Sequence, residues 1–258
     1  MRLFSLALLL FSLLLHAADK DENKTFFTPL YSFSNANINY LDWTNETENK
    51  TLNGDFAYIG LEGGAGWKWG EIYAFANIEN PTKKYVNNGS DNLRTASFAD
   101  LDIKIKNGFR LHIQDFYLQG KPYYVNDFVI GIAYKYQNNS GLWIRPFVGV
   151  HYTNDTYFDG NNGYMTGWTF NYTFRVLQES FSIFQWNEIE FGRTKSFYLS
   201  NDGTKIGDGA SWGYNGALAL MWNINTAFTA ELQYRYARQK LGNIPYQSAM
   251  IYTLKYNF

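Results

Sequence analysis

The side chains that could carry binding chemistry are aromatic rings and carboxylates spaced two residues apart. Phe56 and Tyr58 follow this spacing, with Glu62 four residues farther on, and Tyr73 and Phe75 repeat it in the next segment. Residues two apart lie on the same face of a strand, so these side chains are expected to share one face. Flat rings can stack on a ligand that has a π-face, and carboxylates can accept hydrogen bonds from its hydroxyls. The complete predicted ligand-binding set is Phe33, Phe56, Tyr58, Glu62, Tyr73, Phe75, Asp100 and Arg110.

Patterns for catalysis or metal binding are weak by comparison. Beyond the N-terminal leader the chain keeps His112 and His151. Neither has an identifiable serine two positions away on a paired strand that would complete a nucleophilic triad. The His, Asp and Glu residues do not follow metal-ligand spacing, and the chain contains no cysteine. We therefore expect a protein that is not an enzyme and that needs no cofactor and no metal.

The segments that must position these residues alternate between apolar and polar side chains. The clearest alternation runs over 99–106 and meets Asn107-Gly108, the strongest short signal for a hairpin. The C-terminal segment 246–258 also has one aromatic face and one largely polar face, and a strand of about 10 residues can cross a bilayer if tilted. About twelve strands are predicted, near 30–41, 56–64, 71–79, 99–106, 110–114, 128–136, 142–153, 167–175, 181–191, 214–222, 228–236 and 246–258.

The connections between these segments alternate between short and long. Short ones are expected near 67–70, 107–108, 138–141, 176–179 and 223–227, and longer polar ones between them. Bacterial outer-membrane barrels have this asymmetry, with short periplasmic turns and long extracellular loops, whereas a soluble β-sandwich has no reason to sort its loops. The 19% aromatic content fits the aromatic girdles of such barrels. The predicted fold is all-β, a transmembrane antiparallel β-barrel.

Two segments are expected to depart from regular pairing. Pro146 cannot donate to a ladder, so a bulge is predicted there. In segment 181–191, placing Glu188 and Glu190 inside leaves Gln185 and Asn187 on the lipid side. Polar amides are poorly tolerated against lipid, so we also expect a bulge or a register shift in this strand.

The N-terminal residues indicate export. Met1-Arg2 precedes an apolar run from Leu3 to Leu15 and the small residues Ala17 and Ala18. This pattern predicts a signal peptide over 1–18 and a single barrel domain over 19–258. The run is shorter than the roughly 20 apolar residues of a transmembrane helix. We expect the mature protein in the outer membrane of a Gram-negative cell, in contact with outer-membrane lipid.

The predicted interior mixes acidic and basic side chains, which argues against a pore of one charge sign for acidic sugars or phosphate. A network of mutually neutralising ion pairs is the alternative to a functional role for any one of these charges. The inward rings could likewise fill a narrow lumen instead of binding a ligand. The inward charged residues are Glu62, Asp100, Asp102, Glu188, Glu231, Lys104, Arg110, Arg145, Arg175, Arg235 and Lys255.

Several motifs resemble the Tsx family of nucleoside-specific outer-membrane channels. They are segment 56–62, the turn Trp67-Lys-Trp69, segment 71–76, the run Gln233-Tyr-Arg-Tyr236 and the ending Tyr256-Asn-Phe258. The resemblance extends over the mature chain in the order of its strands. It implies a monomeric twelve-stranded channel with a narrow lumen that passes nucleosides without chemistry.

The same resemblance implies partners. The terminal Phe258 resembles the signal read by the barrel assembly machinery, and outer loops of the family serve as receptors for phages or colicins. A cluster of glycines, Gly60, Gly63, Gly64 and Gly66, departs from the family pattern and bears on the width of the pore. A general porin, or a surface receptor or adhesin barrel without nucleoside selectivity, is the alternative function.

Overall fold

The computed structural model describes residues 26–51, 53–85 and 92–258. The predicted signal peptide, 1–18, lies outside the described residues. The strands are β1 (Tyr31–Trp43), β2 (Phe56–Gly66), β3 (Gly70–Glu79), β4 (Arg94–Lys106), β5 (Phe109–Gln119), β6 (Tyr124–Tyr134), β7 (Tyr136–Gln137), β8 (Leu142–Asp155), β9 (Asp159–Val176), β10 (Glu179–Phe191), β11 (Trp212–Asn223), β12 (Phe228–Arg238) and β13 (Gln247–Asn257).

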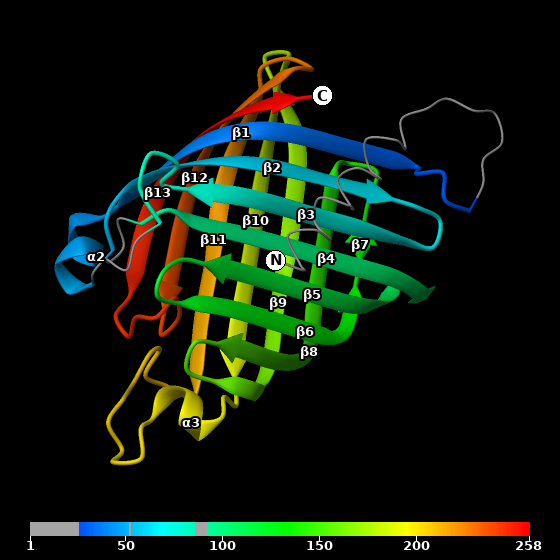
Figure 1. The fold of residues 1–258 in the computed structure, drawn as a ribbon. Coiled ribbons are helices and arrows are strands. Elements are labelled where there is room, and N and C mark those ends of the chain that lie inside the picture. Colours follow the sequence, from blue (N-terminus) through cyan, green and yellow to red (C-terminus); the bar gives the residue numbers. More distant parts are fainter. Residues whose placement is uncertain (1–25, 52, 86–91) are drawn as a thin grey trace.

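Two short helices, α2 (Asn45–Lys50) and α3 (Lys195–Tyr198), lie in loops at the same end of the molecule (Figure 1). Thr44 caps α2, accepting a hydrogen bond from the Thr47 amide, and acidic side chains occupy its first turn. Among the described residues no helix has the length and apolar character needed to cross a bilayer.

The strands form one closed antiparallel barrel. Each pairs with its neighbour in sequence, and β1 pairs with β13 to close the ring (Figure 1). The short β7 continues β6 and pairs with the same partner, β8. The thirteen labelled strands therefore form a barrel of twelve strands. Closure leaves no sheet edge, which a membrane-spanning sheet requires because lipid offers no hydrogen bonds. The predicted twelve-stranded antiparallel barrel is confirmed.

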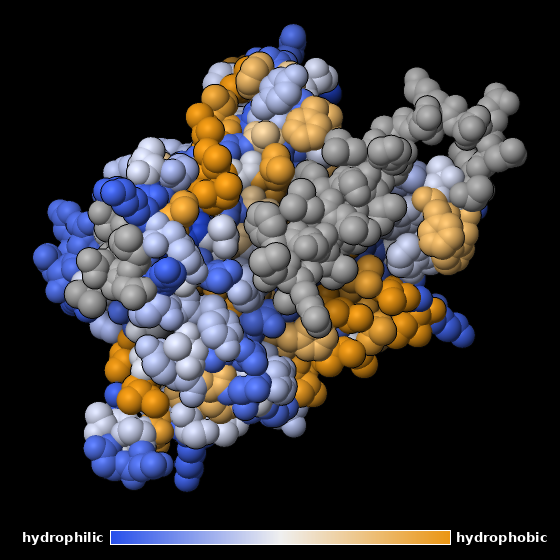
Figure 2. Space-filling view, in the orientation of Figure 1, coloured by the Kyte–Doolittle hydropathy of each residue, from blue (hydrophilic) through white to orange (hydrophobic). Residues whose placement is uncertain are grey.

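The barrel is apolar outside and polar inside. Along β1 the outward Ile38 and Tyr40 are exposed, whereas the inward Asn35, Asn37 and Asn39 are buried. Hydrophobic residues gather on the side of the barrel, and hydrophilic ones cover the end that carries α2 and α3 (Figure 2). This inverted arrangement is the one that lipid on the outside and polar contents on the inside demand.

The two ends of the barrel differ in their connections. One end has tight turns, including Asn107-Gly108 with φ of 53° and 87° and Leu177-Gln178 with φ of 49° and 75°. The positive φ values at both central positions match the twist of a two-residue hairpin. The opposite end carries the long loops with α2 and α3, but 120–123 and 156–158 connect strands there as well and are short. The connection expected between the predicted strands 142–153 and 167–175 is therefore mostly strand.

The bulge predicted at Pro146 is not present. Pro146 pairs in regular register with Trp168, and the irregularity in β8 lies between Val150 and Tyr152. On the other side, partner pairs stop at Ala133–Phe147 and resume at Tyr136–Ile144 without a change of register. The proline therefore interrupts the hydrogen-bond ladder of β8 with β6, which ends opposite Pro146. No extra residue is inserted, so there is no bulge at this position.

The irregularity predicted in β10 was also wrong. Its pairing with β9 and β11 is continuous, with Glu188 and Glu190 inside. Gln185 Oε1 accepts a hydrogen bond from Trp168 Nε1 at 3.1 Å, and the Tyr236 hydroxyl donates to Asn187 Oδ1. Aromatic neighbours thus satisfy an oxygen of each outward amide, which removes much of the cost of placing it against lipid.

Candidate functional site in the lumen

Four inward rings form a connected cluster on the wall made by β1, β3 and β4. The ring centroids of Phe75 and Phe98 lie 5.5 Å apart and stacked. Tyr73 is 6.1 Å from Phe98 and 6.5 Å from Phe75, and Phe33 stacks on Tyr73 at 6.4 Å. Phe33 is 47% exposed and the other three are partly exposed, so their faces are accessible from the lumen. We call Phe33, Tyr73, Phe75 and Phe98 the ring cluster.

Glycines on β2 make room for the side chains of β1. A Cβ at Gly64 would lie 2.7 Å from Cε1 of Phe33, and one at Gly66 would lie 2.3 Å from the Tyr31 ring. The rings of Phe33 and Tyr31 therefore pack directly on the backbone of these two glycines. The glycines that set this chain apart from the expected family pattern thus allow side chains of the first strand to cover the second.

A third inward glycine, Gly60, lies under an amide contact. A Cβ there would meet the side-chain oxygens of Asn77 and Asn37, at 2.4 Å and 2.5 Å. Asn37 belongs to a line of amides along β1, in which Asn39 Nδ2 donates to Asn37 Oδ1 at 2.7 Å and Asn37 Nδ2 to Asn35 Oδ1 at 2.9 Å. The alternation in the sequence placed these amides on one face, but their hydrogen bonds to one another were not foreseen.

Glu62 lies beside the ring cluster and is held by a lysine. Lys255 Nζ is 3.1 Å from Glu62 Oε2 and 2.9 Å from Glu231 Oε2. One buried ammonium group is thus shared by two carboxylates, and the trio keeps a net negative charge. Glu62 Cα is opposite Phe75 in the register of β2 and β3. A carboxylate therefore faces the lumen directly next to the rings.

Asp100 is engaged in a buried ion-pair network that spans the interior. Arg145, on β8, contacts Asp100 Oδ2 at 2.5 Å and Asp102 Oδ2 at 2.9 Å, both on β4. Asp102 Oδ1 is also 2.8 Å from His112 Nδ1. Since β5 and β6 separate β4 from β8 in the sheet, the arginine reaches across the interior. Asp100 therefore has less capacity to accept hydrogen bonds from a ligand.

Other side chains also tie distant strands together. Gln114 on β5 donates to Glu188 on β10 at 2.6 Å, and Lys135 contacts Glu71 on β3 at 2.5 Å. Gln114 and Glu71 are buried, whereas Lys135, Glu188 and the rings of Tyr73, Phe75 and Phe98 are partly exposed. Phe33, at 47%, is the most exposed of these inward side chains.

The remaining predicted site residues lie at two different depths. Phe56 and Tyr58 form a ring pair at 5.9 Å near the loop end, packed with Leu41 and Trp43. Phe56 is buried and covered by the guanidinium of Arg94 at 4.9 Å from its centroid. Arg110 lies near the tight turn after β4, at the opposite end. The structure thus brings Phe33, Glu62, Tyr73 and Phe75 together, with Phe98, but not Phe56, Tyr58 or Arg110.

Asp127, His151 and Glu190 place three possible metal ligands within 4.8 Å of one another near the loop end. Glu190, however, already contacts Lys240 and Arg193. His151 Nε2 is 2.9 Å from Asp127 Oδ1. With two cationic side chains on one carboxylate, this arrangement favours an ion-pair cluster over a divalent ion.

Arg193 fastens the loop 192–211 to the barrel. Its fully buried guanidinium contacts Glu190 and also Asp208 Oδ2, the latter at 3.1 Å, and it donates to the carbonyl of Gln239 at 2.8 Å. Burial raises the pKa of Asp208 to about 7, more than Arg193 lowers it. The two loops after β10 and β12 are therefore joined through Arg193, and also by the Gly242 amide, which donates to Asp208 Oδ1 at 2.8 Å.

A closed antiparallel barrel with an apolar outside, a polar inside and partly exposed rings along one wall defines a solute channel of the bacterial outer membrane. The sequence model of the family described as nucleoside-specific channel-forming protein, Tsx, matches residues 38–258. The chain belongs to this family, as its motifs indicated. The protein is an outer-membrane channel of Gram-negative bacteria, and the family to which it belongs is specific for nucleosides.

Comparison with solved structures finds porins. The NanC porin matches with a TM-score of 0.51 and 9% identity, covering 86% of this chain and 98% of that one. The KdgM porin in complex with disordered oligogalacturonate matches with a TM-score of 0.47 and 10% identity, covering 88% and 99%. The similarity to NanC supports the barrel fold.

Proposed function

We propose that the ring cluster and Glu62 form the site at which a nucleoside binds on its way through the lumen. The observation that carries this proposal is the group of four connected, partly exposed rings with a carboxylate beside it. A base has a flat face that can stack on any of these rings, with about 1–3 kcal/mol per stacked base. The rings form a continuous surface, so a base can move from one to the next without leaving aromatic contact.

Glu62 supplies the polar half of the site. A carboxylate accepts hydrogen bonds only, and the ribose hydroxyls of a nucleoside are donors. Lys255 holds one oxygen of Glu62, which orients the carboxylate and leaves acceptor capacity toward the lumen. The proposed roles of Phe56, Tyr58, Asp100 and Arg110 are therefore different: packing near the loop end for the first two, and charge pairing for the others.

The test is block of ion current by uridine and adenosine in planar bilayers. Tyr73→Ala with Phe75→Ala is expected to raise the half-blocking nucleoside concentration by about tenfold or more, the loss of one to two stacking contacts. Salt conductance is expected to stay equal or to rise because the lumen widens. Tyr40→Ala, which removes an outward ring, is the matched control.

A folded double variant with unchanged block would contradict the proposed site. If wild-type channels pass uridine, adenosine and a sugar of similar size equally, the protein is a general pore and the rings fill space. If wild-type channels pass none of them, a receptor or adhesin role is favoured.

We also propose that the channel works without catalysis. His112 and Asp102 form a pair, but the ring is fully buried and stacks on Phe147 at a centroid distance of 4.5 Å. A general base must reach its substrate within hydrogen-bonding distance, and this imidazole lies under another ring. Recovery of chemically unchanged nucleoside after transport is the expected result, and a converted product would contradict it.

The proposed partners follow from the two ends of the barrel. Phe258 is 55% exposed, and its amide donates to the Ser34 carbonyl at 3.1 Å, so its ring remains available to the barrel assembly machinery. Deletion of Phe258 is expected to lower the amount of assembled barrel. The loops with α2 and α3 are the proposed docking sites for phages or colicins, and we propose that the channel is a monomer in the membrane.

A further inference from the structure

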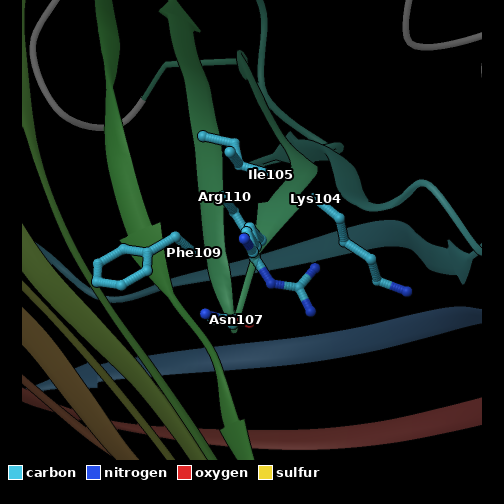
Figure 3. A pocket seen from close by; sticks show the side chains of 7 residues that line it. Lys104, Ile105, Asn107, Phe109 and Arg110 are labelled. Carbon is cyan, nitrogen blue, oxygen red and sulfur yellow. The ribbon is translucent and has the colours of Figure 1, made fainter.

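A pocket of about 330 Å³ lies at the tight-turn end of the barrel, in the hairpin between β4 and β5 (Figure 3). Its volume is within the range of about 300–1,000 Å³ that is usual for small-molecule sites. Three of its lining residues are cationic, Lys104, Lys106 and Arg110, and none is acidic. The remaining lining residues are Ile105, Asn107, Gly108 and Phe109.

The hairpin places Lys104 and Arg110 on one side and the apolar Ile105 and Phe109 on the other. Ile105 and Phe109 are 63% and 52% exposed on the outer side, and Phe109 packs on Tyr134. Figure 3 shows Phe109 directed away from Lys104 and Arg110. The pairing of β4 with β5 shifts register between Lys104, which is opposite Arg110, and Lys106, which is opposite Phe109. Both lysines line the pocket.

Arg110 is the feature that indicates a ligand. The residue is 7% exposed, and within the described part of the chain its Nε and Nη1 atoms are buried and make no hydrogen bond. Its nearest acidic contact, Nη1 to Glu71 Oε1 at 3.3 Å, is an ion pair without hydrogen-bond geometry. Buried donors without acceptors are costly, and an anion in the pocket would supply the missing acceptors.

Glu71 does not neutralise this group of cations. Its carboxylate also contacts Lys135 Nζ at 2.5 Å and accepts a hydrogen bond from the Tyr31 hydroxyl at 2.8 Å. One carboxylate is thus divided between two cations, and Lys104 and Lys106 have no acidic contact among the described residues. Lys104 donates instead to the carbonyl of Trp67 at 3.0 Å. The mixed charge of the interior as a whole therefore hides a local positive excess at this end.

We propose that this pocket binds a phosphate group. A guanidinium with free donors beside two ammonium groups is the chemistry that recognises phosphate oxygens. The site lies at the periplasmic mouth, away from the ring cluster, and does not depend on nucleoside binding. A phosphorylated solute or free phosphate could supply the group from the lumen, and a phospholipid headgroup of the inner leaflet could supply it from the membrane.

The test measures channel conductance while inorganic phosphate replaces chloride at constant ionic strength, in bilayers of phosphatidylcholine. Wild-type conductance is expected to fall saturably with phosphate. Lys104→Gln with Lys106→Gln, and separately Arg110→Gln, are expected to raise the half-saturating concentration about fivefold per charge removed, the effect of one ionic contact in a solvated site. Arg175→Gln, which removes an inward cation near the same end but outside the pocket, is the control.

The outcomes separate this site from the proposed nucleoside site. Half-blocking adenosine is measured in the same channels, and it is expected to stay unchanged in Lys104→Gln/Lys106→Gln. Resistance of the barrel to unfolding in cold SDS verifies that each variant is folded. Equal phosphate saturation in all variants, or an equal loss in Arg175→Gln, would overturn the proposal. A weakening of the block in phosphatidylglycerol bilayers that is larger for the wild type than for Arg110→Gln would support the pocket and assign the lipid headgroup as its occupant.

Discussion

Arg193 Nε donates to Glu190 Oε2 at 2.8 Å, and this is one of the contacts that join the long loop after β10 to the barrel wall. The same guanidinium donates to the carbonyl of Gln239, in the loop after β12. Lys240, the next residue in that loop, contacts Glu188 at 3.3 Å and also Glu190. Two loops at the outer end are therefore anchored by cations that reach into the barrel, instead of being left in solvent.

Replacing Arg193 is expected to free these loops without unfolding the barrel. Arg193→Ala leaves Glu190 and Asp208 with fewer partners and removes hydrogen bonds to two strands, so the loop 192–211 should be cut faster by protease in intact proteoliposomes. Removing one member of a buried ion pair typically costs about 3–5 kcal/mol. Lys205→Ala, an exposed position of the same loop, is the control. Equal cleavage rates for the two variants would contradict the anchoring role.

The docking of this loop should weaken as pH rises. Burial raises the pKa of Asp208 from 3.8 to about 7 in the folded protein. The nearby Arg193 and Lys240 lower this pKa, and Glu190 raises it further. Between pH of about 4 and about 7, the Asp208 carboxyl is therefore protonated in the folded loop and ionised in the unfolded loop. The free energy of unfolding consequently falls as pH rises through this range.

Asp208→Asn is expected to remove this pH dependence because the amide resembles the protonated acid. Protease cleavage of the loop in the wild type should be faster at pH 8 than at pH 5.5, after correction for the activity of the protease on an unfolded peptide. The Asn variant should show the slower rate at both values. A wild-type rate that falls with rising pH would reverse the sign and refute the assignment.

Gly64→Ala tests the close approach between β1 and β2. The added Cβ would lie 2.7 Å from Phe33 Cε1 and 2.9 Å from the carbonyl oxygen of Ile72, and the backbone atom has little freedom to move. Overpacking of this kind costs about 1–3 kcal/mol. We expect a lower urea midpoint in lipid vesicles and weaker nucleoside block, because Phe33 is displaced from the ring cluster.

Gly54→Ala is the matched control, because no atom lies within 4 Å of its Cβ position. Unchanged stability and unchanged block in both variants would mean that Phe33 moves aside freely and that its place over β2 has no importance.

Trp168→Phe tests how the lipid-facing amides of β10 are tolerated. The change keeps an outward ring but leaves Gln185 Oε1 without its donor, which is expected to lower the free energy of unfolding by about 1–3 kcal/mol. Trp212→Phe, another outward ring, should have a smaller effect. The free energy of unfolding is measured with urea in vesicles. Recovery of stability when Gln185→Leu is added to Trp168→Phe would confirm that the unpaired amide is the cause.

The sequence was sufficient to predict the fold because lipid requires apolar side chains on the outer face of every strand. Wherever outward residues were apolar, as in 99–106, alternation located the strand. Strand β5 was predicted to end near Gln114 but runs to Gln119, because its last residues reverse the pattern. Asp115 faces outward there and accepts a hydrogen bond from Asn126 at 2.7 Å. Pairing between outward polar side chains at the interface cannot be recognised from one strand alone.

The candidate site was only partly accessible to sequence reasoning. Alternation gives the face of each side chain but not its depth or its partners across the interior. It therefore grouped Phe56 and Arg110 with Tyr73, although they lie toward opposite ends of the barrel. It could not show that Arg145 reaches Asp100 from a distant strand, and the cluster of Asp127, His151 and Glu190 arises only through folding.

The ties that cross the interior have a mechanical consequence. Arg145, Gln114 and Lys135 link strands that are not neighbours, so the wall cannot bulge or flatten easily as a solute passes. We therefore expect passage to depend on the fixed shape of the lumen. We propose that a stiff barrel with rings on one inner wall favours flat solutes, without any moving part.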